Sequence, residues 1–113
     1  KERRQEIELG NRDVVRDFSD VRFVAAVYKK LMECNTSSEI VNICSGRGVS
    51  LKDILQKMSS IARHKLSAKI NPEFVRKNEV KTLIGSSIKL VSFIGELEPY
   101  PIEETLKWMF DAP

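Results

Sequence analysis

Histidine and cysteine are scarce in this sequence: its 113 residues contain one histidine and two cysteines. Cys34 and Cys44, even together with His64, supply too few ligands for a tetrahedral zinc site. Cys44 lies in an apolar run and Cys34 ends a helix-like run, so we expect reduced, packed thiols. A lone histidine has no evident partner to orient it as a catalytic base. The sequence therefore predicts neither a metal centre nor a catalytic group.

Long hydrophobic runs are also missing. No stretch approaches the roughly 18 apolar residues that span a membrane, and no signal-peptide core follows the first residues. We therefore expect a cytoplasmic protein without a membrane partner. The net charge is +3, and the densest basic run, at residues 1–4, is interrupted by Glu2. Basic runs with interleaved aromatic residues are absent, so a nucleic-acid partner is not expected.

What remains is ordinary globular composition, with 42% hydrophobic and 31% charged residues in a length typical of one domain. Apolar patterning predicts extended segments at residues 6–9, 14–18, 39–44 and 68–70. Helical spacing and capping residues predict helices at 19–34, 50–64 and 86–93, and from 102 onward. The expected caps are Ser19 for the first helix, Ser50 with Asp53 for the second and Gly95 at the end of the third, and residues 35–38 are an expected turn. Residues 71–85 show no regular pattern. We expect one α/β or α+β domain spanning 1–113, with a small mixed sheet and about four helices.

Two of the predicted helices carry apolar stripes that we expect to face the core. The stripe of the first helix comprises Val21, Val24, Tyr28 and Leu31, widened by Ala25, Val27 and Met32. The stripe of the last comprises Ile102, Leu106, Met109 and Phe110.

Two arginines are candidate phosphate ligands. Arg16 lies just before a predicted helix, and Arg76 lies in the irregular stretch. The planar guanidinium offers paired donors that match phosphate oxygens, and it stays charged. The alternative is that both are surface residues paired with acids. Arg16 would then pair with Asp17 or Asp20, and Arg76 with Glu73 or Glu79.

The segment Ser45-Gly46-Arg47-Gly48 invites comparison with phosphate-binding loops. It lacks the GxxxxGK[ST] pattern, and it lacks GxGxxG because residue 51 is leucine. We therefore interpret Gly46 and Gly48 as residues that permit a tight turn between a strand and a helix.

An ordered set of short motifs covers nearly the whole chain. Its members are Gly10-Asn11, the run from Arg16 to Val21 (RDFSDV), Asn42 to Gly46 (NICSG), Arg76, Gly85-Ser86, Lys89 and Pro101 to Leu106 (PIEETL). In this order and spacing the set resembles the C-terminal subdomain of extended short-chain dehydrogenases, the NAD-dependent epimerase/dehydratase family. The residues of the LGN and NICSG motifs look most similar to those of the branch that contains GDP-mannose 4,6-dehydratase and GDP-4-keto-6-deoxymannose reductase.

The resemblance implies a role for particular residues. Arg16 and Arg76 would contact the diphosphate of a nucleotide-sugar substrate from two sides, and Asn11 would lie near the nucleotide. NAD or NADP would belong to an N-terminal Rossmann domain, which would also hold the Tyr-x-x-x-Lys pair. Neither tyrosine here is followed by lysine four residues on. The resemblance thus implies an enzyme as the parent but no activity in this chain alone.

Two further expectations follow. Phe23, Ser86 and Glu96 depart from the family pattern, which leaves open a non-enzymatic binding or interaction domain derived from that fold. The base, the sugar and the choice among epimerase, dehydratase and reductase also stay open. Without its Rossmann partner the subdomain would expose an apolar face, so we expect self-association or strand exchange.

Overall fold

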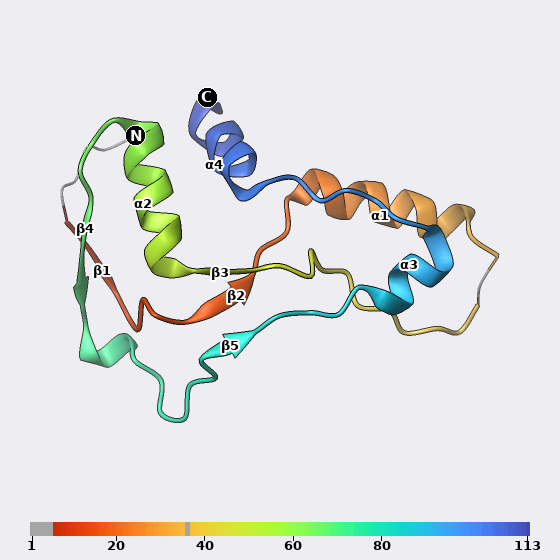
Figure 1. Cartoon of the computed structure of the whole chain (residues 1–113), viewed down its shortest axis with the longest axis horizontal. Coiled ribbons are helices and arrows are strands. Elements are labelled where there is room, and N and C mark those ends of the chain that lie inside the picture. The colour runs from red at the N-terminus through yellow and green to blue at the C-terminus, as the bar shows by residue number, and fades with distance from the viewer. Residues whose placement is uncertain (1–5, 36) are drawn as a thin grey trace.

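The computed structural model describes residues 6–35 and 37–113. The expected solvated basic terminus at residues 1–4 therefore lies outside the described residues, as does Thr36 of the predicted turn. The described chain forms four α-helices and five short strands, beginning with two strands and ending with two helices (Figure 1). The helices are α1 (Val21–Glu33), α2 (Leu51–Ala62), α3 (Ile88–Ile94) and α4 (Ile102–Asp111). The strands are β1 (Glu6–Leu9), β2 (Val15–Asp17), β3 (Gly48–Ser50), β4 (Ser67–Ile70) and β5 (Thr82–Leu83).

The strands form two small sheets rather than one. β1 pairs in parallel with β4, while β2 is central between antiparallel β3 and parallel β5. The mixed α/β class with four helices is therefore confirmed. A 3-10 turn, η1 (Pro72–Phe74), and β5 give some order to the predicted irregular stretch. No helix in the described ranges is long and apolar enough to cross a membrane.

Local signals fixed several element ends. The Ser50 hydroxyl accepts a 3.1 Å bond from the Asp53 amide, which caps α2 as predicted. Gly95, at φ +76°, ends α3 as predicted. At α1 the prediction is wrong by one residue. The cap is Asp20 rather than Ser19, because the Asp20 carboxylate accepts from the Arg22 amide at 2.8 Å.

The core lies between α1 and α3. Phe23, Val27 and Leu90 are buried there, and five partly buried residues pack against them: Leu31, Val41, Ile43, Ile94 and Leu97. Phe23, one of the departures from the resembled pattern, is 5% exposed, and burial favours an apolar residue at this position. A second contact joins α2 to α4 at the other end of the molecule.

The inward face predicted for α1 is only partly right. Val27 is buried and Leu31 packs on the core, but Val21 is 63% exposed, Tyr28 58% and Met32 82%. In α4, Thr105 is the buried residue, whereas the predicted core residues Met109 and Phe110 are exposed. These helices carry more apolar surface than the described chain covers.

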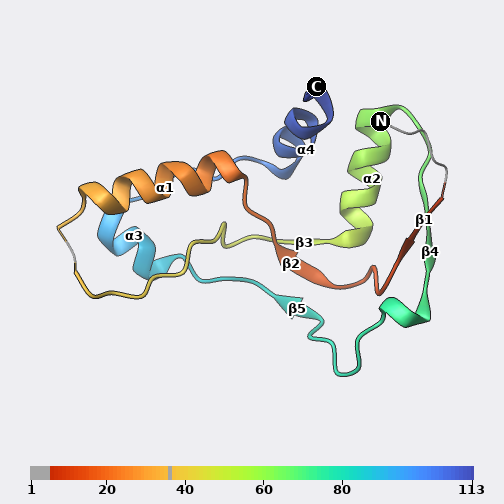
Figure 2. The same cartoon turned by 180° about the vertical axis from the view of Figure 1, so that it is seen from behind.

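The predicted strand at 39–44 is also not formed as a paired strand. The segment is extended and runs back along α1 towards β3 (Figures 1 and 2). Strand pairing begins only at Gly48, within the segment predicted as a loop.

The molecule is flat. Its principal extents are 50 × 37 × 17 Å and its radius of gyration is 16.7 Å. A compact chain of about 100 residues has a radius near 13 Å.

Candidate functional site

Arg16 lies in the middle of β2, and its guanidinium is held by neighbouring carbonyls. One terminal nitrogen donates to the Val15 carbonyl at 2.9 Å and to the Lys81 carbonyl at 3.4 Å. The other lies 3.9 Å from a carboxylate oxygen of Glu79. The side chain remains 28% exposed. The carbonyls therefore fix the direction of the guanidinium while part of it stays open to solvent.

The Arg16–Glu79 pair was not among the pairings considered from the sequence. Asp17 and Asp20, the partners considered from the sequence, accept hydrogen bonds from other residues. Glu79 comes close to Arg16 because β5 pairs in parallel with β2, an arrangement that sets Arg16 opposite Leu83. Asn78, in the left-handed region at φ 58°, reverses the chain just before Glu79. At 3.9 Å the pair is longer than a direct hydrogen bond, so Glu79 does not saturate the arginine.

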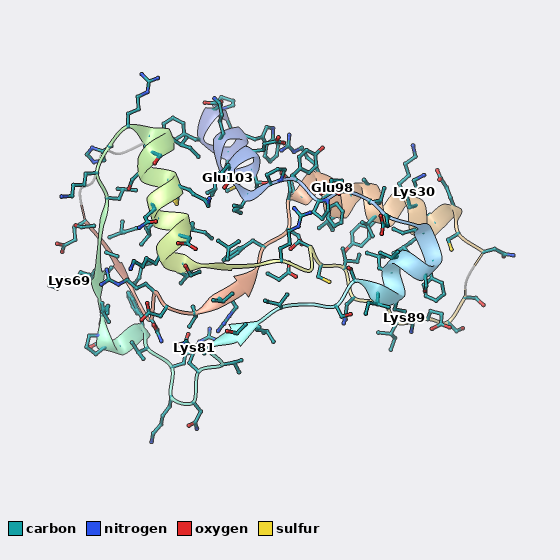
Figure 3. All side chains as sticks on the ribbon, in the orientation of Figure 1. Lys30, Lys69, Lys81, Lys89, Glu98 and Glu103 are labelled. Atoms are coloured by element: carbon teal, nitrogen blue, oxygen red, sulfur yellow. The ribbon has the colours of Figure 1, made fainter. Side chains whose placement is uncertain are left out.

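Arg76 is exposed in the loop between η1 and β5. It makes no hydrogen bond or ion pair with another described residue, so neither Glu73 nor Glu79 is its partner. This loop reaches β2 at Lys81, which is labelled beside β5 in Figure 3 and whose carbonyl also accepts from the Val15 amide at 2.7 Å. Arg76 thus projects from the same loop that holds Arg16.

Asn11 lies in the turn between β1 and β2. Its side-chain oxygen accepts a 2.9 Å bond from the Asp13 amide, which stabilises the turn. The preceding Gly10 lies so close to η1 that a Cβ there would be 2.5 Å from the Phe74 carbonyl oxygen. The Asn11 turn is therefore pressed against the chain that leads into the Arg76 loop.

The β2 strand with Arg16, the Asn11 turn and the loop that carries Arg76 are thus neighbours through the Lys81 carbonyl and the Gly10–Phe74 approach, rather than through contacts between the three side chains themselves. This corner of the molecule lies where β2 meets the loop before β5. Its cationic side chains include Arg16, Arg76, Lys77 and Lys81, and Gly10 allows the close approach of the Asn11 turn to η1.

Asp17 fixes the neighbouring glycine loop. Its carboxylate accepts from the Ser45 amide at 2.9 Å, the Ser45 hydroxyl at 2.5 Å, the Gly46 amide at 2.9 Å and the Gly85 amide at 3.2 Å. Burial raises the pKa of Asp17, but the bonds from Ser45, Gly46 and Gly85 outweigh it and leave the pKa below its ordinary value. The sequence analysis did not predict that Asp17 would accept hydrogen bonds from the Ser45–Gly46 loop, although Asp17 directly follows Arg16 in the sequence.

The same contacts decide whether the glycine loop fits a dinucleotide cofactor. The Ser45 and Gly46 amides, which would cradle a phosphate, are occupied by the chain's own carboxylate. Gly48 is needed for close packing, since a Cβ there would lie 2.5 Å from the Ile84 Cδ1 atom and 2.6 Å from a Val15 methyl. The loop therefore does not fit the pyrophosphate of NAD or NADP.

No family model matches the chain. Among curated proteins it is similar to GDP-6-deoxy-D-talose 4-dehydrogenase from Aggregatibacter actinomycetemcomitans, at 37% identity over 89 residues, which are 79% of this chain and 30% of that protein. It is also similar to GDP-6-deoxy-D-mannose reductase from Pseudomonas aeruginosa, at 28% identity, covering 89% of this chain and 33% of the relative. The chain therefore spans about a third of these relatives.

Solved structures agree. A candidate epimerase from Burkholderia cenocepacia superposes with a TM-score of 0.91 and 51% identity, covering 95% of this chain and 35% of that one. RMD from Pseudomonas aeruginosa, complexed with NADPH, gives a TM-score of 0.81 and 27% identity, covering 92% and 33%. The curated homologues are GDP-sugar enzymes, and the structural neighbours include a candidate epimerase and an RMD that binds NADPH. The 113 residues therefore correspond to one part of an extended short-chain dehydrogenase of the NAD-dependent epimerase/dehydratase family.

Proposed function

We propose that this chain binds the diphosphate of a sugar nucleotide, as the C-terminal substrate-binding part of an NAD(P)-dependent epimerase, dehydratase or reductase. The observation that carries the proposal is the corner at which Arg16 is held beside the loop bearing Arg76. The kinship with GDP-sugar enzymes favours a GDP-sugar. The residues 1–113 then act as a single substrate-binding unit.

In this role Arg16 and Arg76 contact the diphosphate and Asn11 lies near the nucleotide. Carbonyl contacts direct the Arg16 guanidinium before the ligand arrives, which lowers the ordering cost of binding. Each hydrogen bond to a charged phosphate contributes about 1.5–3 kcal/mol. A nicotinamide cofactor would supply hydride transfer in such an enzyme, and the glycine loop here would not hold it, because its amides donate to Asp17.

Calorimetric titration of the chain with GDP-mannose tests the proposal. Arg16→Ala or Arg76→Ala should weaken binding roughly 10- to 100-fold, the equivalent of the lost charged hydrogen bonds. Arg16→Lys should weaken it too, because lysine keeps the charge but not the planar fork. Lys107→Ala, which removes an exposed cation paired with Asp111 on α4, is the matched control and should change nothing.

Unchanged affinity in both arginine variants would reject this site. Titrations with UDP-glucose and with GDP-mannose under the same conditions show whether the site prefers a uracil or a guanine nucleotide. Tighter binding of GDP-mannose is expected. A parent protein that binds both cofactor and sugar nucleotide without turnover would instead support a non-enzymatic binding domain derived from this fold.

A further inference from the structure

The two carboxylate oxygens of Asp17 bond to different parts of the chain. Oδ1 accepts hydrogen bonds from the Ser45 amide at 2.9 Å and from the Ser45 hydroxyl at 2.5 Å. Oδ2 accepts from the Gly46 amide at 2.9 Å and from the Gly85 amide at 3.2 Å. Ser45 and Gly46 belong to one loop, whereas Gly85 follows β5. Oδ2 therefore joins that loop to the end of β5 through a single atom, and we call its two hydrogen bonds the Oδ2 clamp.

The strand that Gly85 follows is too short to be held by pairing alone. β5 consists of two residues, both of them opposite residues of β2 (Figure 1). Just before β5, the Lys81 carbonyl accepts from the Val15 amide at 2.7 Å. Just after β5, the Gly85 amide donates to Asp17. The pairing of β2 with β5 is thus secured at both ends, at one end by the backbone and at the other by the Oδ2 clamp.

The position of β5 decides where the partners of Arg16 lie. One guanidinium nitrogen donates to the Lys81 carbonyl at 3.4 Å, and the other lies 3.9 Å from a carboxylate oxygen of Glu79. Both partners belong to the loop that leads directly into β5. If β5 moved away from β2, the guanidinium would lose both and keep only the carbonyl of Val15, its neighbour in sequence. Arg16 and Asp17 are successive residues of a strand and point to opposite faces, so Asp17 acts on Arg16 through β5.

Gly85 also packs closely on the segment that enters the loop. A Cβ at position 85 would lie 2.6 Å from the Cβ of Cys44 and 2.7 Å from its sulfur. Cys44 is 8% exposed and directly precedes Ser45. Because glycine has no side chain, the Gly85 amide can come within hydrogen-bond distance of the Asp17 carboxylate at this crowded point. The glycine at position 85 is therefore a requirement of the Oδ2 clamp.

We propose that Asp17 is a positioning residue for the diphosphate site. Its Oδ2 clamp holds the end of β5, and β5 in turn places the Lys81 carbonyl that directs the Arg16 guanidinium. The inference rests on the proposed function, because it takes the diphosphate contact of Arg16 from there. Asp17 itself touches no ligand in this role. Its contribution is to order Arg16 before the ligand arrives, which lowers the cost of binding.

Asp17→Ala tests the role, because it removes both acceptor oxygens. Calorimetric titration should show a GDP-mannose affinity about 3- to 10-fold weaker than that of the unaltered chain, which is the cost of ordering one long side chain on binding. Hydrogen exchange at the Gly85 amide should become faster by about 10-fold or more as the Oδ2 clamp opens. Ser45→Ala is the matched control. It removes only the hydroxyl bond to Oδ1 and should leave both the affinity and the Gly85 amide unchanged.

General destabilisation could also weaken binding, so the effect is measured again without Arg16. In an Arg16→Ala chain, Asp17→Ala should change the affinity by less than about 2-fold, since no guanidinium is left to position. A residue with a merely structural role would weaken binding by the same factor in both backgrounds. Circular dichroism checks that each variant is folded. If Asp17→Ala is not folded, Asp17→Asn, which keeps one acceptor oxygen, replaces it, and its affinity should follow the protection of its Gly85 amide.

Equal losses of affinity with and without Arg16 would overturn the inference. So would an unchanged affinity in a variant whose Gly85 amide is released, or a lost affinity in a variant whose Gly85 amide is still protected. Failure of the proposed function gives a different result. If Arg16→Ala alone leaves the affinity unchanged, the nucleotide site is rejected and this role with it. If Arg16→Ala weakens binding and Asp17→Ala does not, only the role of Asp17 is rejected.

Discussion

The Thr105 hydroxyl donates a 2.7 Å hydrogen bond to the carboxylate of Asp20, which joins the start of α1 to α4 across 85 residues of sequence. The Asp20 side chain is fully buried and also accepts from the Arg22 side chain at 3.0 and 2.8 Å. The Arg22 guanidinium lies 4.2 Å from the ring centre of Tyr100 and 4.3 Å from that of Trp108. This cluster docks α4 against the rest of the chain.

Removing either partner of that bond should destabilise the fold. Thr105→Val should lower the free energy of unfolding by about 1.5–3 kcal/mol, the value of a hydrogen bond to a charged group. Asp20→Asn should cost about 2–3 kcal/mol, less than a fully buried pair because Arg22 is 34% exposed. Urea denaturation measures both. Ser92→Ala, which removes an exposed hydroxyl bond to the Lys89 carbonyl, is the control and should have little effect.

Acid should weaken the fold through the same residues. Hydrogen bonds from Arg22 hold the pKa of Asp20 well below its ordinary value near 3.8, and the pKa of Asp17 is also lowered. A depressed pKa in the folded state stabilises at pH values above the ordinary pKa, and that contribution disappears as pH falls through the folded pKa. Unfolding free energies should therefore be steady above about pH 5 and fall below pH 4. Asp20→Asn should flatten this dependence; an unchanged slope would contradict it.

Gly85 should not tolerate a side chain. A Cβ there would lie 2.6 Å from the Cβ of Cys44 and 2.7 Å from its sulfur. Gly85→Ala should destabilise the chain by about 1–3 kcal/mol through overpacking. Ser86→Ala, at the neighbouring exposed position, should be close to neutral. Equal midpoints for the two variants in thermal unfolding would show that the backbone can move aside.

The two thiols should react at different rates. Burial raises the pKa of the Cys44 thiol, as does the nearby Asp17 carboxylate, and the residue is 8% exposed. Cys34 is partly exposed, and its thiol donates to the Phe93 carbonyl at 3.3 Å. A thiol reagent at pH 8 should give a fast and a slow phase, and Cys34→Ser should abolish the fast one. Loss of the slow phase instead would reverse the assignment.

The sequence predicted what depends on near neighbours. Ser50 with Asp53 and Gly95 specify helix ends within a few residues, so α2 and α3 could be placed from pattern alone. The Arg16 partner, Glu79, lies 63 residues away on a loop that β5 positions, and no local signal indicates it. The prediction of a paired strand at 39–44 was wrong for a different reason. The side-chain pattern of a strand is present, but pairing also needs a neighbouring strand, and a local pattern does not indicate one. The inner face of α1 was misassigned because the helix has two apolar faces.

The position of Trp108 has a practical consequence. It is the one tryptophan in the sequence, and it sits on the Arg22 guanidinium at the contact between α4 and α1. The indole is already 45% exposed, but release of α4 would remove it from the face of the Arg22 cation, so its ultraviolet emission should change without any label. The molecule thus carries its own optical reporter for the attachment of its last helix.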